Sequence, residues 1–317
     1  MAFNVAPIRD DLPFGARISG LEYDALEDAG LRAEIRATFE ERGIILFEEV
    51  EPSGRMLVGL STIFGELKEN PVNAAPRVDN DLLPGIMDIY QEPGKAGIVE
   101  LDGRQLSGWL PWHFDHCYND DLNRGAILRP VIIPPRGGTT GFADGIALYQ
   151  AISPELRERI EERNILYRLN VNLEPLRFGR PRNFHEIRRK PGADEMVAQG
   201  EQMPRAVHPA VWTRPSGEKV LHVSPWMALG IEGQEDAEGE ALLHAVCEEI
   251  FAKVQPYFHQ WRPNDMLVWD NWRVLHCASG VELGDARRMH RTTIRGDYGL
   301  GRFENGASGG AILEMTV

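Results

Sequence analysis

His113 and Asp115 are two residues apart, and both have side chains that bind metal ions. On a β-strand, residues two apart lie on one face with Cα atoms roughly 6.5–7 Å apart, so residues 112–115 predict a strand presenting an imidazole and a carboxylate together. Two histidines and one carboxylate around a metal with open positions are typical of a non-haem Fe(II) oxygenase. The pair therefore predicts a metal site that needs one more histidine.

His276 is the candidate for the third ligand. It follows a predicted strand at 265–269 and an Asp270-Asn271 turn, which can return the chain toward the first strand. The chain has nine histidines, and most are expected to be structural or exposed. Spacing alone leaves open the alternative that His276 is a buried core histidine with satisfied hydrogen bonds.

Residues 287–295 contain alternating arginines beyond His276. As a strand, this segment places Arg287, Met289 and Arg291 on one face. Guanidinium groups grip carboxylates through paired hydrogen bonds, so two of them near a metal-binding histidine predict a receptor for two anions, one of them a cosubstrate. The alternative is a solvated basic edge strand that blocks aggregation.

Length and composition predict an ordinary globular protein. The chain has 317 residues, 43% hydrophobic and 26% charged, without an apolar run or an N-terminal leader pattern, so we expect neither a membrane span nor a secretory signal. Cys117, Cys247 and Cys277 lack CxxC spacing, which favours the cytoplasm. The net charge of −14 disfavours a nucleic-acid partner and requires a local basic cluster for any anionic ligand.

Hydrophobic periodicity predicts many short strands and a few helices. Helices are expected at 28–42, 53–64, 145–163 with a new start at 153, and 236–254. Strands are expected at 14–18, 44–47, 86–90, 112–115, 126–133, 207–212, 219–224, 265–269 and 288–295, with Pro130 limiting its strand to an edge or a bulge. Residues 66–84 and 92–110 are expected to be irregular, and residues 172–206, rich in Arg, Pro and Gly, are expected to form a lid-like insertion. Because no βα repeat occurs, this order predicts an α+β, mainly β, sandwich or jelly roll with helices outside.

Several motifs stand in a recognisable order along the chain. They are Phe64-Gly65-Glu66-Leu67, Trp112-His113-x-Asp115, Pro134-Pro135-x-Gly137-Gly138-x-Thr140, Gly145-Ile146-Ala147-x-Tyr149, Trp269-Asp270-Asn271 and the segment from Arg287 to Thr292. An HxD pair alone is a weak signal, but this ordered set resembles the TauD/TfdA family of Fe(II)/2-oxoglutarate-dependent dioxygenases over residues 14–296. The resemblance implies one domain, 1–317, with a double-stranded β-helix (jelly roll, cupin-like) core, flanking helices, and lid insertions at about 66–110 and 172–206 covering the active site.

The resemblance also implies roles for single residues. His113, Asp115 and His276 would bind Fe(II), while Thr140 and Arg287 would hold the C5 carboxylate of 2-oxoglutarate. Arg291, fifteen residues after the second metal histidine, matches the family's arginine for the substrate anion.

The implied reaction uses O2 and releases succinate and CO2 while a small carboxylate or sulfonate is hydroxylated. A halogenase would have a small residue at Asp115, so halogenation is disfavoured. A cytoplasmic homodimer or homotetramer is expected.

The positions for substrate contacts depart from those of taurine enzymes. Where those carry a His and, three residues on, a Tyr, this chain has Asn70 and Asn73, and Trp109 replaces an Asn four residues before the first metal histidine. Taurine is therefore not expected as substrate, and Asn70, Asn73, Trp109 and His116 are candidates for lining the pocket. Residues 271–276 are also similar to the γ-butyrobetaine hydroxylase branch, but its N-terminal zinc module is not expected here, since no cysteine precedes Cys117 in this sequence.

Two further expectations remain. The tryptophans Trp261, Trp269 and Trp272 are interpreted as core residues, and Cys277 as a structural residue pointing away from the site. The alternative function is a jelly-roll protein that binds or senses metals or anions without turnover. Formation of succinate from 2-oxoglutarate with Fe(II) and ascorbate separates this alternative from an enzyme.

Overall fold

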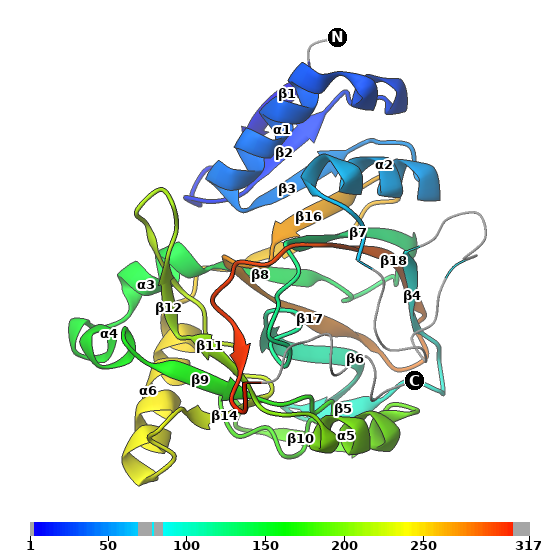
Figure 1. The fold of residues 1–317 in the computed structure, drawn as a ribbon. Coiled ribbons are helices and arrows are strands. Elements are labelled where there is room, and N and C mark those ends of the chain that lie inside the picture. The colour runs from blue at the N-terminus through cyan, green and yellow to red at the C-terminus, as the bar shows by residue number, and fades with distance from the viewer. Residues whose placement is uncertain (1–2, 69–77, 79–84, 307–317) are drawn as a thin grey trace.

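Two β-sheets packed face to face form the centre of the molecule, and helices cover the outside (Figure 1). The computed structural model describes residues 3–68, 78 and 85–306. Within these residues, the larger sheet has seven strands in the order β1 (Asn4–Pro7), β2 (Ala16–Ser19), β3 (Ile44–Glu48), β16 (Met266–Asp270), β7 (Gly125–Ile132), β18 (Arg287–Ile294) and β4 (Ile86–Gln91). The other has six, β10 (Phe184–Arg188), β5 (Ile98–Leu101), β6 (Arg104–His113), β17 (Val274–Glu282), β8 (Thr140–Asp144) and β15 (Tyr257–His259).

Alternation along β3 shows how the layers form. Ile44 and Leu46 lie in a core cluster that includes Phe142 of the six-stranded sheet, so this face packs between the sheets. Ile45 and Phe47 lie in another cluster, with Leu57 of helix α2 (Gly54–Phe64). Because both faces of β3 are covered, its sequence is a continuous apolar run.

The remaining elements lie mostly at the lower left and bottom of Figure 1. A smaller sheet contains β14 (Ala228–Ile231), β9 (Asn164–Tyr167), β11 (Ala206–Pro209) and β19 (Arg302–Phe303), and β12 (Val211–Thr213) forms a hairpin with β13 (Lys219–Leu221). The other helices are η1 (Tyr23–Glu27), α1 (Ala29–Arg42), α3 (Gly145–Ala151), α4 (Pro154–Ile160), α5 (Ala193–Gln202) and α6 (Ala237–Lys253).

The helix predictions are confirmed, and their capping residues give the reason. The side chains of Asp28 and Ser53 accept hydrogen bonds from the third backbone N–H groups beyond them, as N-caps do. Gly43 ends α1 in the left-handed region at φ 75°. The break expected at residue 153 separates α3 from α4.

Two local predictions are wrong. Residues 92–110 are not irregular, because β5 and β6 form a hairpin across Asp102 and Gly103, whose φ angles of 50° and 76° suit a two-residue turn. Asp-Gly is a strong hairpin signal that the sequence did offer. The strand expected to include Asp115 ends earlier, because β6 stops at His113 and leaves Asp115 in the following turn. Residues 172–206, expected to be an insertion, contain β10 and α5.

The strand with Pro130, β7, lies inside its sheet and is not an edge strand. Its pairing with β16 covers only Gly125 to Leu128, and its pairing with β18 shifts register beside Pro130. Pro130 is paired with Met289 directly beside this shift, so the bulge alternative is confirmed.

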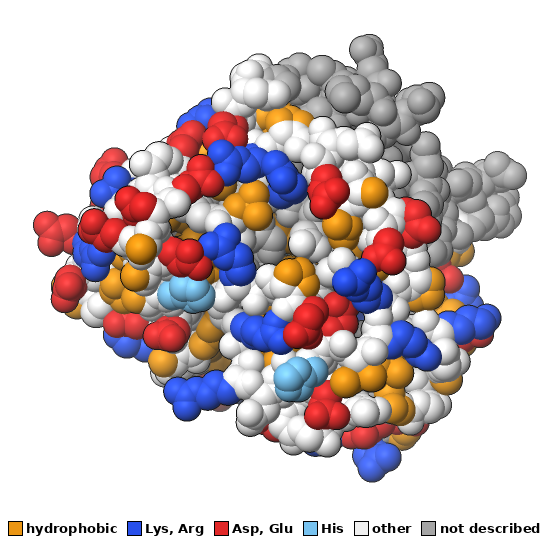
Figure 2. Space-filling model, turned by 90° about the horizontal axis from the view of Figure 1, so that it is seen from below, with side chains coloured by type: hydrophobic (Ala, Val, Ile, Leu, Met, Phe, Trp, Pro, Cys, Tyr) orange, Lys and Arg blue, Asp and Glu red, His pale blue; other side chains and the backbone are white. Residues whose placement is uncertain are grey.

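The surface charges and the helices relate to the expectations about a nucleic-acid partner and a membrane span. On the face seen in Figure 2, the described Lys and Arg side chains are interspersed with Asp and Glu and form no continuous basic patch. Among the described residues, no helix combines the length and apolar character needed to span a bilayer.

Candidate metal centre and anion pocket

The structure brings His113, Asp115 and His276 together from distant segments. The two histidines are direct partners on neighbouring strands β6 and β17, and their ring centroids lie 4.1 Å apart. The Nε2 atoms of His276 and His113 lie 3.6 and 4.0 Å from Oδ1 of Asp115. One ligand atom from each residue lies within 4.8 Å of the others, and all three residues are buried. This cluster can hold one metal ion.

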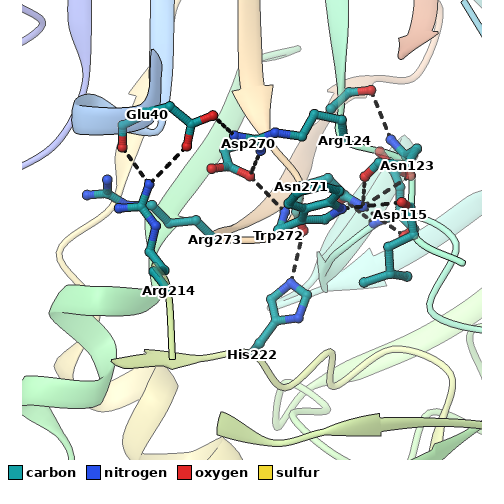
Figure 3. Close-up of polar contacts among 12 residues, drawn as sticks. Glu40, Asp115, Asn123, Arg124, Arg214, His222, Asp270, Asn271, Trp272 and Arg273 are labelled. Carbon is teal, nitrogen blue, oxygen red and sulfur yellow. Dashed lines mark hydrogen bonds and ion pairs between the residues drawn. The ribbon is translucent and has the colours of Figure 1, made fainter. Parts of the chain in front are cut away.

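Asp115 does not lie on a strand, although a strand was predicted at residues 112–115. It lies in the turn after β6, so no sheet ladder fixes its backbone. Instead the side-chain Oδ1 of Asn271 accepts a hydrogen bond from the Asp115 N–H at 2.7 Å, and its Nδ2 donates to the Asp115 carbonyl at 3.0 Å. Figure 3 shows Asn271 at the centre of these contacts.

The protonation states suit a divalent cation. The His113 Nδ1 lies 2.8 Å from the Pro111 carbonyl, which can only accept, so the proton is on Nδ1 and the Nε2 lone pair is free. Burial and the neighbouring His276 lower the pKa of His113 to about 3. Burial by itself would raise the pKa of Asp115, but Arg291 and the histidines bring it well below its usual range. Neutral imidazole and ionised carboxylate are the forms that bind metal.

Arg287 is a buried cation without a buried anion. Its side chain is 7% exposed; its Nε donates to the Gly138 carbonyl at 3.0 Å and its NH2 to Thr140 Oγ1 at 3.2 Å. Among the described residues, no carboxylate is within ion-pair distance of it. Burial lowers the pKa of Arg287 to about 10, so the group is still charged at neutral pH. A buried charge without a partner is costly, so this position is suited to an anionic ligand.

Gly138 leaves space beside the side chain of Arg287. Gly138 has a φ of 67°, and a Cβ there would lie 2.5 Å from Pro134 Cγ and 3.2 Å from Arg287 Cδ. A side chain at Gly138 would therefore be strained and would displace the guanidinium stem.

Arg291 lies on the same face of β18 as Arg287. Between them, Met289 is buried in the core between the sheets, which confirms the predicted alternation. The strand lies between β7 and β4, so the alternative of a solvated basic edge strand is wrong. The guanidinium of Arg291 donates to both carboxylate oxygens of Asp115, at 3.3 and 2.6 Å. Its role toward a substrate stays a prediction.

The other pocket candidates lie in different surroundings. Trp109 pairs with Ser279 in the sheet, and its ring packs on Phe184 at 5.0 Å. His116 follows Asp115 with a φ of 60°, and its buried Nδ1 has no hydrogen-bond partner among the described residues. Asn70 and Asn73 lie outside the described residues.

Two contacts of the site were missed from the sequence. Asn271 was recognised only as part of a turn motif, and Trp261 was interpreted as core. Trp261 is indeed buried between the sheets, but its indole Nε1 donates to Thr140 Oγ1 at 3.1 Å. Since an indole N–H gives no sequence pattern by which to find its acceptor, only the structure shows this contact.

Two facing sheets thus carry a His-Asp-His cluster that can hold a metal ion and a buried arginine without a carboxylate partner among the described residues. Comparison with known proteins identifies the family. Residues 4–293 match the family described as "Taurine catabolism dioxygenase TauD, TfdA family", so the chain belongs to this family. Its members are alpha-ketoglutarate-dependent dioxygenases, so the protein is an oxidoreductase that uses 2-oxoglutarate and a metal.

Relatives and solved structures agree with this family. The chain is 28% identical over 305 residues to the (S)-phenoxypropionate/alpha-ketoglutarate-dioxygenase of Sphingobium herbicidovorans, covering 93% of this chain and 96% of the relative. It is 27% identical to the alpha-ketoglutarate-dependent 2,4-dichlorophenoxyacetate dioxygenase of Cupriavidus pinatubonensis, covering 90% and 95%. A taurine dioxygenase from Burkholderia xenovorans has the same fold, with a TM-score of 0.68, 23% identity and 98% of both chains covered.

Proposed function

We propose that this protein is an Fe(II)- and 2-oxoglutarate-dependent dioxygenase that hydroxylates a small organic anion, built on a double-stranded β-helix. The observation that carries the proposal is that the structure contains both a buried His-Asp-His cluster and a buried arginine, Arg287, for which the described residues provide no counter-ion. A metal site with three protein ligands leaves positions open for a cosubstrate and O2. The facing seven- and six-stranded sheets support the assignment of the β-helix.

In this proposal His113, Asp115 and His276 hold the iron through His113 Nε2, one ring nitrogen of His276 and a carboxylate oxygen. Bound iron supplies the oxidative decarboxylation of 2-oxoglutarate to succinate and CO2 and the oxidation of the substrate. Arg287 neutralises the distal carboxylate of 2-oxoglutarate. The oxygen of Thr140 accepts from both Arg287 and Trp261, so its own O–H is free to donate to the same carboxylate.

We further propose that Arg291 binds the anionic group of the substrate. Its two terminal nitrogens contact Asp115, but its buried Nε has no hydrogen-bond partner among the described residues, which leaves a donor for a ligand. The relatives named above are named for carboxylates, and another relative, from Pseudomonas putida, is named for a sulfate ester. We expect a carboxylate or sulfonate, with Asn70, Asn73, Trp109 and His116 shaping the pocket, and not taurine.

The test measures succinate formed from 2-oxoglutarate with Fe(II) and ascorbate under air. The panel contains (S)-phenoxypropionate, 2,4-dichlorophenoxyacetate, an alkylsulfonate, an alkyl sulfate and taurine. We expect succinate to rise with at least one carboxylate or sulfonate and not with taurine, and the rise to vanish in His276→Ala. A protein that binds Fe(II) and 2-oxoglutarate, yet forms no succinate with or without any panel member, would contradict the proposal and favour a sensor.

A further inference from the structure

We propose that Asn271 is the positioning residue of the metal centre, and that its side-chain amide sets the direction of the Asp115 carboxylate by fixing the Asp115 backbone. The inference rests on the proposed function because it takes Asp115 as a metal ligand. It adds a residue outside the three proposed metal ligands and the proposed 2-oxoglutarate contacts. Figure 3 shows the residues that carry it.

The need for such a residue follows from where β6 ends. His113 is held by its ladder with His276, but Asp115 lies two residues beyond the strand, and the backbone of His116 then turns at φ 60°. The amide of Asn271 supplies what a neighbouring strand would supply, one acceptor for the Asp115 N–H at 2.7 Å and one donor to its carbonyl at 3.0 Å. Both backbone groups of the ligand residue are thus satisfied by one side chain.

Asn271 is itself held in one position by its neighbours. It is 0% exposed, and its Nδ2 also contacts Asn123, at 3.1 Å to Oδ1 and 3.3 Å to the carbonyl. Its backbone N–H donates to the Arg124 carbonyl at 3.1 Å, and its carbonyl lies 2.9 Å from Nε2 of His222. With donors and acceptors on every side, the amide can take only one orientation.

The turn that contains Asn271 also leads into β17 and His276. One short segment, 270–276, therefore carries one ligand and fixes the backbone of another. Arg291 holds the Asp115 carboxylate from the opposite end, but a guanidinium on a long side chain does not fix the backbone. Loss of an outer partner of a metal ligand typically costs 10–100-fold in affinity.

The experiment measures the Kd of the full-length protein for Mn(II) by calorimetry, without 2-oxoglutarate, and the absorption spectrum of the Co(II) form, which reports ligand geometry. We expect Asn271→Ala to raise the Kd about 10–100-fold and to change the Co(II) spectrum. Asn271→Asp keeps an acceptor for the Asp115 N–H but loses the donor to the Asp115 carbonyl. Its Kd for Mn(II) should therefore lie between the values for the wild type and for Asn271→Ala. Asn271→Asp also allows the inference to be tested if Asn271→Ala does not fold.

Arg124→Met is the matched control, because it disrupts the same buried network without touching Asp115. Arg124 pairs through its side chain with Asp270 and Glu40, while its carbonyl, which accepts from Asn271, remains. We expect Arg124→Met to lower thermal stability and to keep the Mn(II) Kd within about twofold. A wild-type Kd in both Asn271 variants, or an equal rise in Arg124→Met, would overturn the inference. A wild-type protein that does not bind Mn(II) would instead refute the metal site itself.

Discussion

Two buried arginines, Arg124 and Arg287, show how the same side chain serves structure in one region and ligand binding in another. They are 9% and 7% exposed. Arg124 pairs with Asp270 and with Glu40, at 2.5 Å from the latter, and lies over the rings of Phe39 and Trp272. Within the described part of the chain, Arg287 donates hydrogen bonds to neutral oxygens, those of Gly138 and Thr140.

The pKa values follow this difference. Burial lowers the pKa of both, but Asp270 and Glu40 outweigh burial at Arg124 and raise its pKa above the usual value. At Arg287 nothing opposes burial, and the pKa falls to about 10. A buried arginine whose charge is matched within the chain stabilises the fold, whereas one whose charge is unmatched indicates where an anion from outside binds.

The largest effect is expected at Asp115, the buried acid that is available to bind a metal. Asp270 forms an ion pair with Arg124, whereas Asp115 lies beside two histidines as well as Arg291. Asp115→Ala should raise the Kd for Mn(II) by more than about 100-fold, beyond the loss of an outer partner, and abolish succinate formation. Calorimetry and the succinate assay check this, and wild-type metal affinity in the variant would show that Asp115 is not a ligand.

Arg287→Met should separate ligand binding from stability. Removing one partner of a buried charged pair costs about 2–5 kcal/mol, so the Kd for 2-oxoglutarate should rise about 30-fold or more. Without ligand, the free energy of unfolding should change by less than about 1 kcal/mol or increase, because an unmatched charge is removed. At 100 times its Kd, 2-oxoglutarate should stabilise the metal-loaded wild type by about 2.7 kcal/mol and not the variant at the same concentration. Denaturant unfolding with and without 2-oxoglutarate measures both effects.

Arg124→Met should behave in the opposite way. It leaves Asp270 buried without its cation, so the free energy of unfolding should fall by about 3–5 kcal/mol. The Kd for 2-oxoglutarate, measured by calorimetry well below the unfolding temperature, should stay within about twofold of wild type. If the two arginine variants lost stability equally, the distinction between matched and unmatched charges would be wrong.

Arg291→Met addresses an intermediate case, because Arg291 is paired with Asp115 while its Nε has no hydrogen-bond partner among the described residues. We expect the Kd for 2-oxoglutarate to change little and the KM for the anionic substrate to rise about tenfold or more, since one charged hydrogen bond contributes about 1.5–3 kcal/mol. Steady-state kinetics with each compound varied in turn checks this. A rise in the KM for 2-oxoglutarate alone would indicate that Arg291 contacts the cosubstrate and not the substrate.

Trp261→Phe should give the smallest effect. It removes one hydrogen bond to Thr140, worth about 1 kcal/mol, so the Kd for 2-oxoglutarate should rise about fivefold. Trp212→Phe is the control, because its indole donates to the Trp272 carbonyl, away from Thr140. Equal Kd values in the two variants would show that Trp261 is a core residue only.

The sequence by itself determined helices α1 to α4 and α6, some of the strands, and the residue types of the site. Capping residues such as Asp28 and Gly43, and the apolar run of β3, act over a few neighbours, so they can be recognised locally. The alternation at Arg287, Met289 and Arg291 held for the same reason. The ordered motifs indicated His113, Asp115 and His276, which the structure brings together.

The tertiary structure decided which charges are matched and what holds the ligands in place. The resemblance indicated Arg287 as a ligand contact, but whether Arg124 or Arg287 is paired with an acid cannot be read along the chain, because Asp270 and Glu40 lie far from Arg124 in sequence. Asp115 was expected on a strand, but β6 ends at His113, and the amide that replaces the ladder comes from residue 271. Such contacts depend on how the two sheets and their turns pack, and pairing between distant segments leaves no periodic pattern in the sequence.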